Sequence, residues 1–351
     1  MKPNQLRVGD HVAIVSLSSG VLGEKFVAHE LELGIKRLEE MGLVPVFMPN
    51  SQKGIDYLSK NPKARAEDLV AAFENKHIKG IICAIGGNDA YKVIPFILDD
   101  KKAVETIKNN PKFFMGFSDS TIDHLLLNKL GLNTFYGPAF LTDFAELDTE
   151  MLPYTKFWFL NLLLNLNHTK LTPSDVWYKE RTDFSMSALG TPRQMQFEER
   201  KYMCLCGQGE EEGELFGGCL DVIYSIFDKE DKEKQKVFAK YDILPKTNKD
   251  KILFLETSDS KPTPAVFEKM LKTLKENKFF DGVKGVLFGK PQDEKYFDDY
   301  AKIIKQELAE YNILYNVNFG HALPRCIMPY NIKTKVNFDN KTIEFVEKMF
   351  E

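Results

Sequence analysis

The sequence predicts an α/β protein of two domains, in which a parallel sheet precedes a second unit of mixed strands and helices. Three observations lead to this prediction. The chain has 351 residues, whereas a single hydrophobic core rarely grows beyond roughly 250–300 residues. Early in the chain, short apolar runs alternate with segments of helical periodicity, which is typical of a parallel sheet covered on both faces. This alternation ends near residue 150, and a second set of strands begins after residue 210.

The first unit alternates strands with helices. Its predicted strands include HVAIVSLSS (11–19), LVPVFMP, GIICAIGG (80–87) and FFMGFS, and NTFYGP closes the unit. The segment KFVAHELELGIKRLEEMG has apolar residues at helical spacing and ends at Gly42, and glycine commonly stops a helix. Further helices are predicted around RAEDLVAAFEN, from Asp89, and after FFMGFS. Sites in such sheets form where strands end and helices begin, so these junctions hold the candidates.

The rest of the chain predicts a crossing segment and a second unit. YTKFWFLNLLLNLNH predicts a helix, and some 40 residues without a clear period follow it. We therefore predict domains at 1–165 and 211–351, with 166–210 as a crossing segment or insertion. The second unit contains two predicted helices, 264–277 and 295–311, and apolar runs that include GELFGGCLDVIYSIF, KILFLETSDS, VKGVLFGKP, ILYNVNFGHALP, KVNFD and TIEFVE.

Composition narrows the function classes. The formal net charge is −4 and the charges are interspersed, so nothing suggests an electrostatic nucleic-acid binder. Five cysteines, two of them at positions 204 and 206, indicate free thiols in a reducing compartment rather than a disulfide framework. No run of about 18 apolar residues occurs, and the first residues lack an apolar signal-peptide core. We expect no membrane span and a cytoplasmic location.

Ser118 stands between an apolar strand and a helix in the segment FFMGFSDSTIDHLLLNKLG. A serine here can cap the helix, a role worth about 1 kcal/mol. It can also be a nucleophile on a strand-to-helix turn, with Gly116 allowing the turn and following N–H groups facing an oxyanion. The hydrolase pattern Gly-x-Ser-x-Gly is incomplete, because Ser120 replaces its second glycine. The segment alone leaves both roles open.

Three further strand ends carry candidate chemistry. The loop AIGGNDAY (84–91) can be a tight turn, a phosphate loop or, as we favour, a source of an oxyanion N–H group. Glu256 ends the apolar strand KILFLE, and His321 follows another apolar strand and a glycine. In the order Ser118, Glu256, His321, these residues supply a nucleophile, an orienting carboxylate and a base. No histidine pair has metal-ligand spacing, so we expect no metal.

Several ordered motifs resemble the LD-carboxypeptidase family of serine peptidases, which also contains the microcin C self-immunity proteins. The motifs are GFSDST, NTFYGP, GELFGGCLDVI, ILFLETSDS, GVLFGKP and NFGHALPRCIMPYN, and they span nearly the whole chain. The resemblance implies a Rossmann-like N-terminal domain, a smaller C-terminal α/β domain, and Ser118, Glu256 and His321 as catalytic triad. It also implies oxyanion N–H groups at Gly87 or Asn88 and at Asp119, no cofactor, and a homodimer.

Two residues bear on which branch of the family this chain resembles, the carboxypeptidases or the immunity proteins. Cys219 occupies a glycine motif that tends to read Gly-Gly-Asn in the carboxypeptidases, which makes it a candidate substrate contact. The crossing segment resembles that of the immunity-like branch, where an aromatic residue stacks on a nucleotide base. Trp177 is the candidate for this stacking, and packing between the domains is its alternative role.

The function predicted from these residues is amide hydrolysis through an acyl-enzyme. The leading substrate class is a cell-wall-type peptide with an L-to-D bond near its end, and the first alternative is an aminoacyl-nucleotide conjugate. An unrelated α/β-hydrolase also has the order Ser–Glu–His, but the missing second glycine argues against it. The alternative of another class is a two-domain small-molecule binding protein in which Ser118 only caps its helix.

Overall fold

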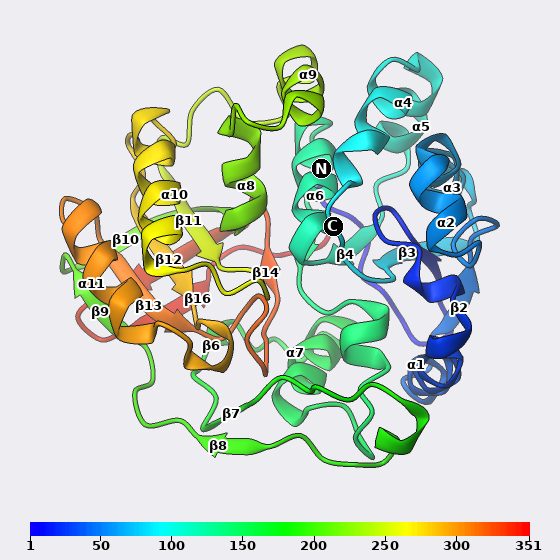
Figure 1. Ribbon diagram of the computed structural model, residues 1–351, viewed down its shortest axis with the longest axis horizontal. Helices are drawn as coiled ribbons and strands as arrows, with labels where there is room; N and C mark the ends of the chain where they lie inside the picture. Colours follow the sequence, from blue (N-terminus) through cyan, green and yellow to red (C-terminus); the bar gives the residue numbers. More distant parts are fainter.

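The computed structural model describes residues 1–351 and contains two large sheets with helices around them (Figure 1). The N-terminal sheet has the order β14-β5-β4-β3-β1-β2, and its first five strands in the sequence pair in parallel. Its strands are β1 (His11–Val15), β2 (Val44–Phe47), β3 (Ile78–Cys83), β4 (Phe113–Gly116), β5 (Phe135–Tyr136) and β14 (Met328–Pro329). The sequence prediction of an α/β fold that begins with a parallel sheet is confirmed.

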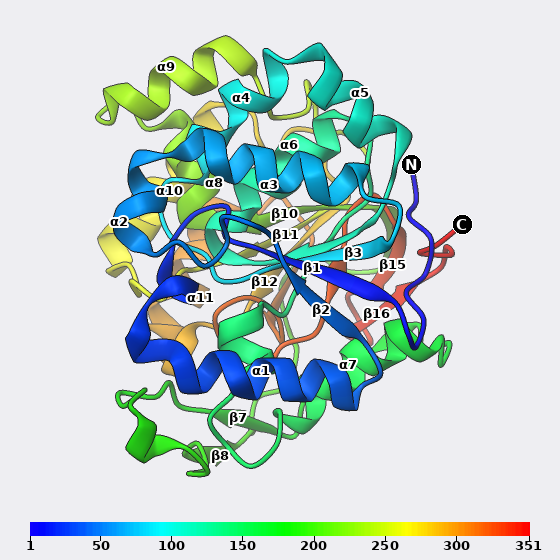
Figure 2. The ribbon, with the colours of Figure 1, turned by 90° about the vertical axis from the view of Figure 1, so that its right-hand side faces the viewer.

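Helices cover both faces of the N-terminal sheet (Figure 2). The helix α1 (Ala28–Glu40) lies on one face and α3 (Pro62–Glu74) on the other. Further helices are α2 (Ile55–Lys60), α4 (Ile94–Leu98), α5 (Lys101–Asn109), α6 (Thr121–Lys129) and α7 (Pro153–Leu164). The helix expected from Asp89 is instead a 3-10 turn, Ala90–Val93, followed by α4, whose Pro95 fits the first helical turn.

The C-terminal sheet has the order β6-β16-β15-β10-β11-β12-β13-β9. Its four central strands are parallel, and the outer strands pair antiparallel. The strands are β6 (Lys170–Leu171), β9 (Met203–Cys206), β10 (Glu210–Cys219), β11 (Lys251–Glu256), β12 (Gly285–Gly289), β13 (Ile313–Val317), β15 (Lys333–Asn337) and β16 (Thr342–Phe345). The mixed strands expected for this half are confirmed.

This half contains more helices than the sequence predicted. The predicted helices correspond to α10 (Pro264–Glu276) and α11 (Phe297–Glu307). Two others, α8 (Leu220–Phe227) and α9 (Lys232–Tyr241), were not predicted. The boundary between β10 and α8 could not be recognised in the run GELFGGCLDVIYSIF, because the end of the strand and the start of the helix are both rich in apolar residues.

The two halves interlock through short strands. Strand β14 lies in sequence between β13 and β15 of the C-terminal sheet but pairs with β5 of the N-terminal sheet. Strands β6 and β9, which fall in the predicted crossing segment, form the two edges of the C-terminal sheet. The rest of that segment carries the two-stranded ribbon β7 (Val176–Tyr178) and β8 (Met195–Phe197), below the sheets in Figure 1. One cluster of 69 buried apolar residues runs through both halves, so they share a hydrophobic core.

Candidate active site

Ser118 occupies a strained turn directly after β4. Its φ is +63°, in the left-handed region that costs a residue with a side chain of order 1–3 kcal/mol and often marks a functional site. Neither the 3-10 turn Ser118–Ser120 nor the following α6 receives a capping hydrogen bond from a side chain. The Oγ atom lies instead 3.0 Å from Nε2 of His321. The capping role is therefore wrong.

Glu256 and His321 form a buried pair at the ends of two parallel strands. Glu256 is the last residue of β11, and His321 follows β13. The His321 Nδ1 atom lies 2.8 Å from Oε2 of Glu256, and the backbone N–H of His321 donates to the same oxygen at 3.1 Å. With Nδ1 carrying a proton toward the carboxylate, Nε2 is free to accept the proton of Ser118.

The charge of Glu256 governs the protonation of His321. Burial alone would lower the pKa of His321, but the nearby Glu256 carboxylate, its hydrogen bond and the charge of Asp259 outweigh that effect. The pKa of His321 is therefore raised above its ordinary value of 6.5. Asp259 is 76% exposed and has a carboxylate oxygen 4.0 Å from Nε2 of His321.

Tyr136, which the sequence analysis did not assign, links the two halves of the site. Its hydroxyl accepts a hydrogen bond from the backbone N–H of Ser118 at 3.0 Å and donates to Oε1 of Glu256 at 2.6 Å. The side chain is fully buried, and burial together with the Glu256 charge raises the pKa of Tyr136 well above its ordinary value. It therefore stays a proton donor. This residue lies in the motif NTFYGP, but an aromatic residue in an apolar strand is typical of a hydrophobic core and therefore gave no sign of a catalytic role.

The glycine loop after β3 crosses directly over Ser118. A Cβ atom on Gly86 would lie 2.8 Å from the Cβ of Ser118, so only glycine fits there. The backbone N–H groups of Gly87 and Asn88 have no acceptor in the protein. This is the arrangement expected of oxyanion donors, although their role stays a prediction. Asp119 is buried, and its carboxylate ties the turn to the loop by accepting from Ser18 Oγ and Ala90 N–H.

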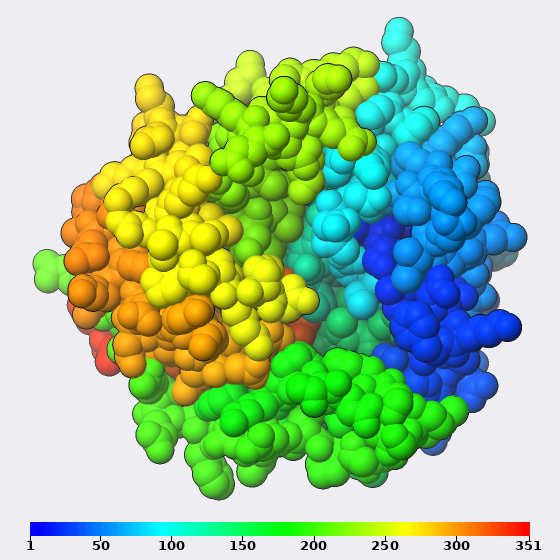
Figure 3. Space-filling model, viewed as in Figure 1, coloured from blue at the N-terminus to red at the C-terminus, as the bar shows by residue number.

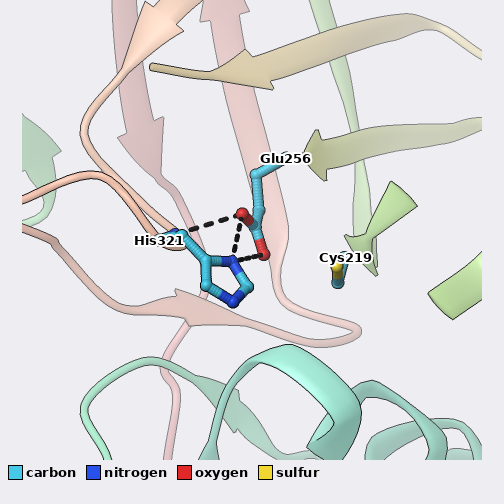
Figure 4. A group of neighbouring side chains, drawn as sticks. All are labelled: Cys219, Glu256 and His321. Atoms are coloured by element: carbon cyan, nitrogen blue, oxygen red, sulfur yellow. Dashed lines mark hydrogen bonds and ion pairs between the residues drawn. The ribbon is translucent and has the colours of Figure 1, made fainter. Parts of the chain in front are cut away.

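Cys219, Glu256 and His321 offer potential metal-ligand atoms within 4.8 Å of one another (Figure 4). The Glu256 oxygens, however, already accept hydrogen bonds from His321 and Tyr136. Burial and the charges of Glu256 and Asp221 raise the pKa of the Cys219 thiol well above its ordinary value, which disfavours a thiolate ligand. The geometry suits an oriented imidazole better than a metal centre. The thiol is fully buried and does not line the cavity, so its predicted substrate contact stays untested.

A cavity of about 400 Å³ opens beside His321. It is lined by Val21, Phe26, Val27, Glu30, Ile85, Phe117, Leu141, Thr142, Glu180, Phe184, Arg193, Asp259, Gln292, His321 and Arg325. Figure 3 shows the surface hollowed where the two halves meet the bright green crossing segment. A larger hollow of about 640 Å³, formed largely by residues near the C-terminus, contains none of the predicted site residues.

Trp177 does not line this cavity. Its ring is buried, and Nζ of Lys290 lies 5.1 Å from the ring centroid. This placement favours the packing role over stacking on a ligand. Phe26 and Phe184 are instead exposed aromatic residues that line the cavity. The sequence analysis missed them because neither lies in a recognisable motif.

Comparison with known proteins gives the family. The LD-carboxypeptidase N-terminal domain model matches residues 12–137, and the LD-carboxypeptidase C-terminal domain model matches residues 212–336. The chain belongs to the LD-carboxypeptidase family. The predicted resemblance is thus confirmed, and the family identifies the protein as a serine-type carboxypeptidase or hydrolase.

The relatives of this LD-carboxypeptidase-family chain carry two kinds of name, MccF or MccF-like and carboxypeptidase. An MccF-like protein from Streptococcus pneumoniae, solved in complex with AMP, has a TM-score of 0.93 at 44% identity and covers 96% of this chain and 99% of its own. The microcin C7 self-immunity protein MccF of Escherichia coli is 26% identical over 98% of this chain and 95% of its own. A Treponema pallidum protein assigned by name to the carboxypeptidases is 28% identical, over 98% and 94% respectively.

The predictions about location, oligomeric state and domain boundaries are not tested by the fold or by the relatives. None of the helices is both long and apolar enough to cross a membrane. The cytoplasmic location, the homodimer and the boundaries at 165 and 211 stay predictions from the sequence.

Proposed function

We propose that this hydrolase cleaves an amide or related acyl bond through a covalent acyl-enzyme on Ser118. The observation that carries the proposal is the unbroken hydrogen-bonded series Glu256–His321–Ser118, which joins two sheets at the wall of a cavity. A nucleophile bonded to a base, itself oriented by a carboxylate, is the arrangement that nucleophilic acyl transfer needs.

The groups divide the tasks of this mechanism among them. Nε2 of His321 takes the Ser118 proton as Oγ attacks the carbonyl, and Glu256 stabilises the imidazolium. The tetrahedral oxyanion lies against the N–H groups of the glycine loop and of Asp119. The imidazolium then protonates the leaving group, and water, deprotonated by His321, releases the acyl group from Ser118.

Two substrate classes are candidates, and a different observation favours each. The family description favours a peptide that loses its terminal residue, such as a cell-wall-type peptide with an L-to-D bond. The AMP bound to the 44% identical Streptococcus pneumoniae protein favours an aminoacyl-nucleotide conjugate. Phe26 and Phe184 are exposed aromatic residues that line the cavity. They are therefore better placed than Trp177 to stack on a nucleotide base.

The test is Ser118→Ala, assayed side by side on a murein tetrapeptide and an aminoacyl sulfamoyl adenosine. Turnover of the accepted substrate should fall by about 10⁴–10⁶-fold, because no other group replaces the nucleophile. Thermal unfolding should match the parent protein, and Ser59→Ala on the exposed face of α2 is the control. Near-parental turnover by Ser118→Ala would overturn the proposal.

A further inference from the structure

Arg325, four residues after His321, is a buried cation whose guanidinium makes no hydrogen bond in the protein. The residue is 3% exposed, and Nε and Nη1 of its guanidinium are buried without an acceptor in the protein. The guanidinium forms an ion pair with the buried carboxylate of Asp143, whose Oδ1 lies 3.4 Å from Nε without accepting a hydrogen bond from it. The other Asp143 oxygen accepts from Ala139 N–H and from the Thr142 hydroxyl.

A second buried arginine shows how this fold satisfies a structural guanidinium. Arg65 is 0% exposed, and its Nε donates to the carbonyl of Leu58 at 3.0 Å. Its two terminal nitrogens bind both oxygens of Asp89, at 2.7 and 3.0 Å. Burying a charged donor without an acceptor costs more free energy than burying a neutral one. The guanidinium of Arg325, whose buried N–H groups lack acceptors, therefore needs a different explanation.

The position of Arg325 supplies that account. Its guanidinium carbon lies 4.0 Å from the centroid of the Phe117 ring, and that ring packs edge-on against the His321 imidazole at 5.1 Å. All three residues line the cavity beside Ser118. The Arg325 charge also acts on His321 directly, by opposing the rise in the pKa of that residue. The cation therefore lies next to the reacting groups.

The carboxylates that line the cavity do not neutralise Arg325. Glu180 accepts from Arg193 and Gln292. Burial and the charge of Glu146 raise the pKa of Glu30 to about 7, so its carboxyl group is largely protonated just below neutral pH. Asp259 forms its closest pairing with His321 and none with Arg325. Asp143 is therefore the carboxylate that pairs with Arg325, and the guanidinium keeps N–H donors that a ligand can use.

We propose that Arg325 binds a carboxylate of the substrate, so that the substrate carries this group close to the bond that is cleaved. The inference rests on the proposed hydrolysis at Ser118 and names the chemistry that accompanies it. Guanidinium binds carboxylate through charge-assisted, often paired hydrogen bonds, and burial strengthens them. Two sources offer this group: the C-terminal carboxylate of a peptide, or the side chain of an acidic acyl residue on a nucleotide conjugate.

Two matched substrate pairs distinguish these sources. One pair is a murein tetrapeptide with a free or an amidated C-terminus, and the other is aspartyl or asparaginyl sulfamoyl adenosine. The parent protein should prefer the carboxylate member of one pair by about 10–100-fold in kcat/KM, the range that a hydrogen bond to a charged group supplies. A preference in the first pair assigns the terminal carboxylate, and one in the second pair assigns the acidic acyl side chain.

Arg325→Gln should abolish that preference, mainly through KM, and Arg325→Lys should restore part of it. The control is Arg200→Gln, because Arg200 also has a guanidinium 4.2 Å from a phenylalanine ring and an aspartate 3.3 Å away, but does not line the cavity. This control should keep the parental preference.

Equal rates of the parent protein on both members of both pairs would overturn the inference, whether or not the variants fold. An equal loss on both members in Arg325→Gln would overturn it too. In either case, dependence of turnover on Ser118 would leave the proposed hydrolysis standing. Undiminished turnover by Ser118→Ala would instead remove the proposed function itself.

Discussion

The two halves of the candidate site are fixed by different means. In the N-terminal half the backbone holds Ser118, through its left-handed φ, its N–H bond to Tyr136 and the glycine loop packed over it. In the C-terminal half, side-chain charge holds His321, because Glu256 accepts hydrogen bonds from both its ring and its backbone N–H. One half therefore fixes a position and the other fixes a protonation state.

This difference predicts that substitutions in the two halves should have different effects on the rate and on its pH dependence. Changes that act only on the placement of Ser118 should lower the rate and leave the pH profile unchanged. Changes among the charges around His321 should move the acid limb of kcat/KM, which reports the pKa of the free base. Since the base must be neutral to accept a proton, activity should rise with pH through an apparent pKa above 6.5.

Glu256→Gln should have the largest effect among the charged groups. The amide cannot stabilise the imidazolium and favours the wrong tautomer, so kcat should fall about 10³–10⁴-fold. The residual activity should have its acid limb at lower pH, because the charge that raised the pKa of His321 is gone. Rates across pH measure both effects, with Glu67→Gln on the exposed face of α3 as the control. An acid limb displaced upward would contradict the assignment.

The sequence predicted the partners in this series because all three side chains follow parallel strands. Strand β4 leads into Ser118, β11 ends at Glu256 and β13 precedes His321. Each strand is mostly apolar and buried, and functional sites in such sheets form at the carboxyl ends of the strands. Their approach across two sheets required the resemblance to a family, since no local pattern encodes a contact between residues 203 positions apart.

Other parts of the site give no local pattern. Strands β5 and β14 contain two residues each, too few to show an alternation, so the pairing that joins the halves was not predictable. Arginine is mostly a surface residue, so the sequence gives no reason to expect a buried guanidinium without hydrogen bonds at Arg325. Trp177 was assigned from the resemblance alone, and its burial against Lys290 depends on the fold of the crossing segment.

Tyr136→Phe tests the link between the two halves, with an intermediate expected effect. Loss of the hydroxyl leaves the Ser118 N–H without its partner and removes the donor that shares the Glu256 charge. We expect kcat/KM to fall about tenfold and stability by about 1–3 kcal/mol. The acid limb should move to higher pH. Without the hydrogen bond from Tyr136, the Glu256 carboxylate attracts the His321 imidazolium more strongly and raises its pKa further.

Tyr315→Phe is the matched control for that variant, since its buried hydroxyl donates only to the backbone carbonyl of Phe297. It should lose stability in thermal unfolding but keep the parental pH profile. If Tyr136→Phe behaved in the same way, Tyr136 would be a packing residue and the two halves would be joined by other contacts.

Asp259→Asn should produce the smallest effect and act on protonation alone. Asp259 is mostly exposed, so water and salt screen its charge, yet it faces Nε2 of His321 at 4.0 Å. Removing that negative charge lowers the pKa of His321, so the acid limb should move to lower pH while kcat at alkaline pH stays parental. The displacement should shrink as salt is added. Asp298→Asn, which removes another mostly exposed carboxylate, paired with Arg200, should leave the pH profile unchanged. A drop in the alkaline kcat of Asp259→Asn, with the limb unmoved, would instead assign Asp259 to substrate binding and separate it from the charges that set the base.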